Sequence, residues 1–121
     1  MALTRSFRET VQKRVKNDPE FRAHLLKEAM DCFLAGDIDT GKSLLRDYLN
    51  ATESTDKIAL TINTDVKSIR RMIGPKGNPT TKNLFNIFKA CTKNEKIVIT
   101  ASIHQSAKKK KTKEKIRAIQ G

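Results

Sequence analysis

The sequence contains no tryptophan and one tyrosine, and most of its five phenylalanines fall in apolar helical patterns. A protein that stacks the bases of single-stranded nucleic acid needs exposed aromatic side chains, so this composition argues against a stacking platform. Cysteine is equally scarce: Cys32 and Cys91 lie on apolar helical stripes, where a cysteine acts as a small hydrophobic residue, and they show no metal-ligand spacing. We therefore expect no disulfide, no metal, no cofactor and no enzymatic activity.

Long hydrophobic runs are absent as well. No segment approaches the roughly eighteen consecutive apolar residues of a membrane-spanning helix, and the chain has no apolar N-terminal segment. Apolar residues make up 37% of the 121 residues, which suffices for one domain with a small core. We expect a reduced, cytoplasmic protein that does not insert into membranes.

The 13 acidic residues do not balance the 25 lysines and arginines, so the net charge is +12. The excess is uneven: residues 1–50 carry nine basic against eight acidic side chains, residues 51–105 nine against four, and residues 106–121 seven against one. A strongly basic protein favours a polyanionic partner, and nucleic acid is the commonest one. This asymmetry predicts a protein-facing N-terminal half and a DNA-facing remainder.

Apolar residues recur at helical spacing through most of the chain and predict an all-α fold of about six helices. Capping residues and prolines mark where four of these helices begin: Thr4, Asp18-Pro19, Asp39 or Thr40, and Thr80 or Thr81. The expected parts are N-terminal helices in residues 1–50, a helix-turn-helix region in 51–95, a strand in 96–104 and a flexible lysine-rich tail in 105–121.

The segment from Thr55 to Pro79 has the residue spacing of a DNA-reading helix-turn-helix. Such a motif needs a small residue where its helices cross and a turn residue that tolerates a left-handed backbone, and Ala59 and Asn63 meet these demands. Asp65 can cap the second helix, and Gly74 in a left-handed conformation is expected to end it. The inward residues of the two helices are predicted to be Ile58, Ile62, Ile69 and Met72.

Residues 18–86 resemble the small bacterial antidote (antitoxin) regulators of addiction modules, which are relatives of the phage-repressor-type helix-turn-helix proteins. The resemblance is carried by Leu44 to Thr52, Lys67-Ser68, Arg71-Met72, Gly74-Pro75-Lys76-Gly77-Asn78-Pro79 and Asn83-Leu84-Phe85. It implies a cytoplasmic autorepressor that binds an operator and also neutralises a toxin encoded beside it.

Two sets of residues follow as candidate DNA contacts. The outer face of the second motif helix is expected to read bases in the major groove through Val66, Lys67, Arg70 and Arg71. Phosphate contacts are expected from residues at helix starts and in the loop after that helix: Thr55, Lys57, Ser68, Lys76, Gly77, Asn78, Thr80 and Lys82.

Residues 96–103 change to the alternating pattern of a β-strand. No other segment offers a partner strand, so we expect pairing with a second copy, or with a partner protein. One face of the strand would form the homodimer contact through Ile97, Ile99, Ala101 and Ile103. Two recognition helices would then reach successive major grooves of a palindromic operator.

Residues 36–43, GDIDTGKS, match the phosphate-binding loop pattern G-x-x-x-x-G-K-S. That loop works between a strand and a helix, whereas the preceding residues here predict the end of a helix. We therefore interpret the match as a turn between two helices.

These observations favour a sequence-specific DNA-binding repressor that acts as a homodimer and binds double-stranded DNA and a small toxin protein. Two alternatives stay open. A toxin-binding protein would need only the N-terminal helices, and a non-specific nucleic-acid-binding protein would act through the basic tail without base preference. An ordinary helix pair remains the structural alternative to the helix-turn-helix.

Overall fold

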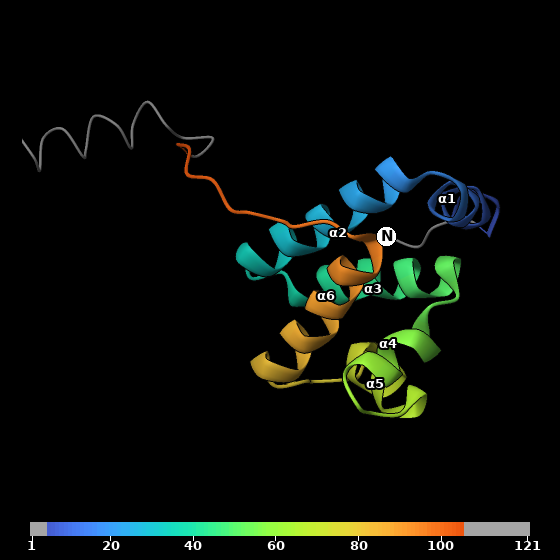
Figure 1. Ribbon diagram of the computed structural model, residues 1–121. Helices are drawn as coiled ribbons and strands as arrows, with labels where there is room; N and C mark the ends of the chain where they lie inside the picture. The colour runs from blue at the N-terminus through green and yellow to red at the C-terminus, as the bar shows by residue number, and fades with distance from the viewer. Residues whose placement is uncertain (1–4, 106–121) are drawn as a thin grey trace, which may run out of the picture.

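The computed structural model describes residues 5–105 and shows an all-α protein (Figure 1). Within that range there are six helices and no β-strand, which confirms the predicted all-α class. The helices are α1 (Arg5–Asn17), α2 (Pro19–Leu34), α3 (Ile38–Thr52), α4 (Thr55–Thr61), α5 (Val66–Ile73) and α6 (Thr81–Glu95). The short helices α4 and α5 lie together on one side of the longer ones (Figure 1). None of the described helices is long and apolar enough to cross a membrane.

Side-chain caps fix where the longer helices begin. The carboxylate of Asp18 accepts a hydrogen bond from the Phe21 N–H at 3.1 Å, as predicted, and the Thr80 hydroxyl caps α6. The predicted start of α3 is too late. Asp37 accepts a hydrogen bond from the Thr40 N–H at 3.2 Å, so α3 already begins at Ile38. Thr4 lies outside the described residues.

One apolar core joins the long helices to α4 and α5. Leu26 of α2, Leu45 of α3, Ile69 of α5 and Ile87 of α6 are completely buried. Cys91 is also buried, and this burial raises the pKa of its thiol to about 12. The thiol therefore stays neutral and packs as a small hydrophobic residue. Because α5 contributes to the same core, its position is set by the long helices.

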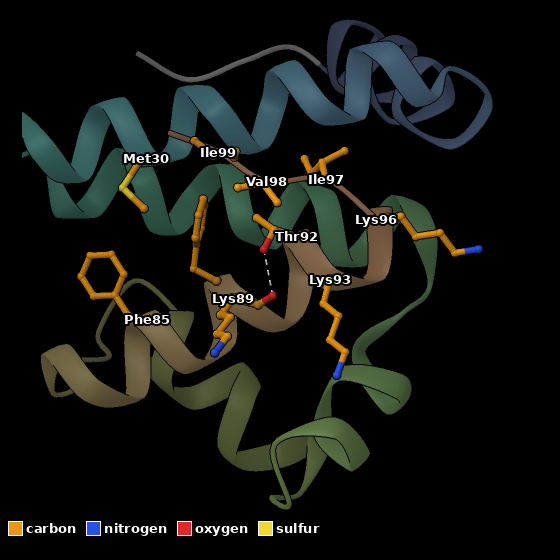
Figure 2. A pocket seen from close by; sticks show the side chains of 10 residues that line it. Met30, Phe85, Lys89, Thr92, Lys93, Lys96, Ile97, Val98 and Ile99 are labelled. Atoms are coloured by element: carbon orange, nitrogen blue, oxygen red, sulfur yellow. Dashed lines mark hydrogen bonds between the residues drawn. The ribbon is translucent and has the colours of Figure 1, made fainter. Parts of the chain in front are cut away.

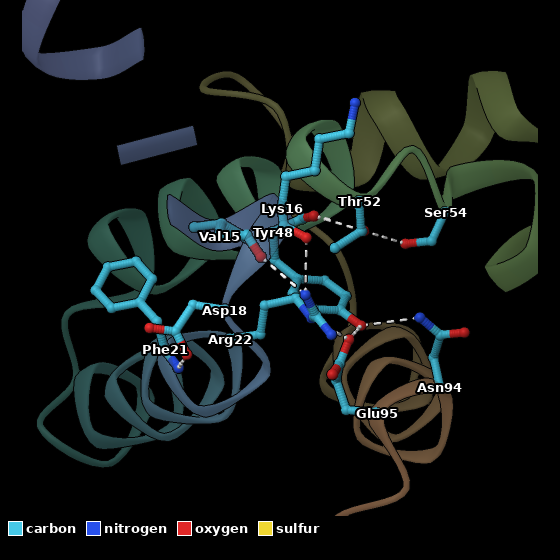
Figure 3. A network of polar contacts seen from close by, with 10 residues as sticks. All are labelled: Val15, Lys16, Asp18, Phe21, Arg22, Tyr48, Thr52, Ser54, Asn94 and Glu95. Carbon is cyan, nitrogen blue, oxygen red and sulfur yellow. Dashed lines mark hydrogen bonds and ion pairs between the residues drawn. The ribbon is translucent and has the colours of Figure 1, made fainter. Parts of the chain in front are cut away.

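A partly buried polar network links four helices beside this core (Figure 3). The Glu95 carboxylate accepts hydrogen bonds from the Tyr48 hydroxyl at 2.6 Å and from the Arg22 Nε at 2.9 Å. Arg22 also donates to the carbonyls of Val15 and Lys16 at the end of α1. Burial and the bond to Glu95 raise the pKa of Tyr48, so it stays a donor at neutral pH. The network holds α1, α2, α3 and α6 in one arrangement.

Residues 97–105 follow α6 without regular secondary structure and run beside α2 (Figure 1). The predicted strand is therefore not confirmed in the described part of the chain. The predicted alternation of inward and outward side chains is present over residues 97–99, because Ile97 and Ile99 pack against the core while Val98 is 86% exposed. Ala101 and Ile103 are exposed, so the four proposed dimer residues do not share one free face. A ladder needs a second strand, and residues 5–105 form none with which this segment could pair. Most of the predicted tail, residues 106–121, lies outside the described residues.

Candidate nucleic-acid interface

The turn between α4 and α5 has the geometry that the sequence predicts. Asn63 adopts a left-handed backbone with φ of 55°, and Ala59 is 4% exposed. The Thr64 N–H donates to the Ala59 carbonyl at 2.9 Å, which turns the chain sharply toward α5. An asparagine tolerates this conformation better than most residues because its short polar side chain bonds locally. Asn63 and Ala59 are thus confirmed in their predicted places.

The helix α5 is capped at its N-terminus and anchored by two isoleucines. Asp65 accepts a hydrogen bond from the Ser68 N–H at 2.7 Å, and this bond lowers the pKa of the Asp65 carboxyl. Ile69 and Ile73 are buried, whereas Met72 is only partly buried. Met72 packs against the core as predicted, and the inward stripe also includes Ile73, which the sequence analysis did not name. Spacing of four residues from Ile69 would have indicated Ile73.

The four predicted base-reading residues do not share one face of α5. Lys67, Arg70 and Arg71 are exposed, but Val66 packs partly against the core, so its prediction as an outward residue is wrong. Lys67 and Arg71 are four residues apart and lie opposite the buried isoleucines. Arg70 lies on the flank of the helix, beside a small hollow that Asp56 also lines.

A second polar hollow shows which residues the sequence analysis missed. Arg71 and Ser68 of α5 line it together with Asn63 of the turn and with Asn83 and Asn86 of α6, and its volume is about 320 Å³. Both α6 asparagines are exposed. An amide can donate to and accept from base edges or phosphates. The three-residue spacing of Asn83 and Asn86 could have placed both on one face of a helix. Only the fold shows that this face lies next to α5.

Hydrogen bonds from two side chains of α3 hold the end of α5 and the loop that follows it. The Lys42 Nζ donates to the carbonyls of Gly77 at 2.6 Å and of Gly74 at 3.2 Å, and Arg46 donates to the Ile73 carbonyl. Gly74 has φ of −69°, so the predicted left-handed conformation is wrong there. A Cβ at Gly74 would lie 2.9 Å from the Arg70 carbonyl oxygen, which explains the glycine by close approach.

The structure separates the predicted phosphate contacts into two groups. Lys57, Lys76, Asn78, Thr80 and Lys82 are exposed, although the Thr80 hydroxyl already caps α6. Thr55 is 8% exposed, and the Gly77 N–H already donates to the Gly74 carbonyl at 2.9 Å, so neither is free to hold a phosphate in the predicted way. Ser68 is half-buried and bonds to Asp65. The exposed candidates therefore lie on α4, in the loop after α5 and at the start of α6.

The G-x-x-x-x-G-K-S match covers the turn after α2 and the first six residues of α3, in agreement with the helix-to-helix interpretation. Gly36 adopts φ of 84° in this turn. The Lys42 side chain is 4% exposed and donates to the loop after α5, so it is not available to a nucleotide phosphate. The capping residue is Asp37 rather than the predicted Asp39.

An apolar groove lies away from α5, between α2, α6 and residues 97–99 (Figure 2). Its volume is about 890 Å³, and its apolar lining comes from Met30, Phe85, Phe88, Ile97, Val98 and Ile99. Lys89, Lys93 and Lys96 also line it. Exposed apolar surface of this kind is typical of a protein interaction site.

No protein-family model matches the chain, and no curated protein and no solved structure matches it. In residues 5–105, no three His, Cys, Asp or Glu side chains lie close enough to hold a metal ion. The features that point to a function are therefore the basic face of α5, the loop that follows it and the apolar groove.

Proposed function

We propose that this chain is a sequence-specific DNA-binding repressor that controls its own gene as the antitoxin of an addiction module. The observation that carries the proposal is the α4–α5 unit, in which left-handed Asn63 and capping Asp65 present a short basic helix. Lys67 and Arg71 project from the exposed side of that helix. A helix presented in this way fits the major groove, and long basic side chains at its outer face reach base edges.

The surroundings of α5 support a duplex partner. The proposed recognition helix, α5, is flanked by three exposed lysines, Lys57, Lys76 and Lys82. These can hold the phosphates on both sides of a groove. Phosphate contacts fix the register of the protein on the duplex, while the face of α5 supplies base preference. The resemblance to antidote regulators adds the autorepressor role.

A protein partner is supported by the opposite side of the molecule. The apolar groove is separated from α5, so a bound toxin would leave the DNA-reading face free. Residues 98–105 make no backbone hydrogen bond to other described residues, and their amides and carbonyls are available to a second chain. We propose that this segment pairs with its copy in a homodimer, which would place two α5 helices about 34 Å apart on DNA.

The experiment that tests DNA reading compares two duplexes by fluorescence anisotropy. One carries the DNA upstream of this chain's own gene, and the other carries the same bases in scrambled order. Lys67→Ala or Arg71→Ala should weaken binding to the upstream duplex by about 1–3 kcal/mol and affect the scrambled duplex much less. On the upstream duplex each variant loses a base contact, whereas on the scrambled duplex it loses only a screened charge.

Lys27→Ala is the matched control, because Lys27 is an exposed cation of α2 whose ion pair, among the described residues, is with exposed Asp31 on the same helix. It should lower binding to both duplexes slightly and equally. If Lys67→Ala and Arg71→Ala also lower both affinities equally, α5 does not read bases and the proposed function is wrong.

A further inference from the structure

Lys42 is a buried cation that the sequence motif left unexplained. Its side chain is 4% exposed, and its nearest carboxylate among the described residues is that of Asp39, 3.7 Å away and 92% exposed. An ammonium group is costly to bury unless hydrogen bonds replace its hydration. Here the replacement comes from two backbone carbonyls of the loop after α5, at Gly74 and Gly77. The placement therefore couples α3 to that loop.

Arg46 continues the same contact one turn later on α3. Its guanidinium donates to the Ile73 carbonyl, the last residue of α5. The final carbonyls of a helix have no partner within the helix and carry its negative dipole end, so cations stabilise them. Lys42 and Arg46 thus hold the C-terminal end of α5 and its loop, while Asp65 caps the other end.

Two glycines near Lys42, Gly41 and Gly77, stand where a side chain would collide with neighbouring atoms. A Cβ at Gly77 would lie 2.1 Å from the Arg71 carbonyl oxygen, so only glycine lets the loop fold back to reach Lys42. A Cβ at Gly41 would lie 2.2 Å from the Phe33 ring, so glycine also lets α3 approach α2 closely. Both glycine and lysine of the G-K-S match therefore have a packing role in this fold.

We propose that Lys42 and Arg46 are positioning residues for base recognition. This inference rests on the proposed function and deepens it. α5 has only eight residues and two fully buried anchors, so its tilt depends on how its ends are held. The two cations fix the C-terminal end and, through the Gly77 carbonyl, the peptide that carries the Asn78 N–H. In a planar trans peptide that N–H points away from Lys42, toward the exposed side of the loop.

The test uses Lys42→Met, which keeps the length of the side chain and removes its donors, with Lys27→Met as the control for loss of one charge. Circular dichroism first establishes that the variant is folded at the temperature of measurement. The upstream and scrambled duplexes then give the ratio of specific to non-specific affinity. We expect Lys42→Met to lower this ratio about tenfold, as expected when roughly one bidentate base contact is lost. Lys27→Met should leave the ratio unchanged.

Amide hydrogen exchange gives a readout that needs no DNA. In Lys42→Met the amides of residues 73, 74, 76–78 and 80 should exchange faster, while those of α2 should keep their wild-type rates. Arg46→Met and Arg46→Lys form a second pair at a half-buried position and cover the case in which Lys42→Met does not fold. Arg46→Met should lower the affinity ratio, and Arg46→Lys should restore most of it, because a lysine can still donate to the Ile73 carbonyl.

The outcomes separate the two proposals. A wild-type protein without preference for the upstream duplex would overturn the proposed function. A wild-type protein with preference, together with folded Lys42→Met and Arg46→Met variants that keep the full ratio, would overturn the positioning role alone.

Discussion

Gly77 and Gly36 are glycines for different physical reasons. A side chain at Gly77 would collide with backbone atoms of Arg71 and Met72, whereas the space around Gly36 is open and only its φ of 84° disfavours other residues. Gly77→Ala should therefore destabilise the fold by about 3 kcal/mol through forced backbone shifts. Gly36→Ala should cost about 1 kcal/mol.

Urea unfolding of both variants, followed by circular dichroism, measures this difference. Gly77→Ala should also weaken specific DNA binding at temperatures where it remains folded, because the loop can no longer reach Lys42. Equal stability losses in the two variants would show that the close approach at Gly77 is not a constraint.

Local signals at single residues were predicted well, and distant partners were not. Asp18, Asp65 and Asn63 act within four residues of themselves, so their capping and turn roles follow from the sequence. Lys42 could not be understood in this way, because its partners lie 32 and 35 residues further along the chain. The G-x-x-x-x-G-K-S pattern is the same whether its lysine contacts a nucleotide phosphate or a backbone carbonyl.

Among the secondary-structure elements, the α4–α5 unit was the most predictable and the segment after α6 the least. Helical spacing alone located both motif helices, although it placed Val66 outside and overlooked Ile73. In residues 97–99 the alternation of apolar residues was read correctly, but it does not continue to residue 103, and a strand also requires a neighbouring strand. That requirement concerns hydrogen bonds between chains, which the sequence of one chain does not specify.

Val98→Pro tests whether residues 97–103 pair with a second copy. Val98 is exposed and makes no backbone bond to described residues, so proline there should not disturb the chain's own packing. Loss of one ladder donor should shift the sedimentation equilibrium from dimer to monomer and weaken operator binding. Val98→Ala keeps the N–H and should remain a dimer; an unchanged mass for Val98→Pro would contradict strand pairing.

Across the whole molecule, basic charge is concentrated after residue 50, and residues 106–121 add seven lysines and arginines against one glutamate. Such charges attract every DNA sequence alike, because phosphates carry no base information. Removing residues 106–121 should make the affinity less dependent on salt and leave the ratio of specific to non-specific binding nearly intact. Salt titrations of both duplexes measure this. A truncated protein that loses the ratio would show that the tail itself reads DNA, as a minor-groove arm would.

The proposed function depends above all on base reading by the exposed face of α5. Selection of bound duplexes from a randomised pool, carried out in parallel with wild-type protein and Arg71→Ala, tests it most directly. The wild-type protein should enrich one motif of two inverted half-sites spaced by about one helical turn of DNA. Arg71→Ala should enrich the same motif with base preference lost at one position in each half-site. No enriched motif, or a motif that is identical for both proteins, would contradict the account.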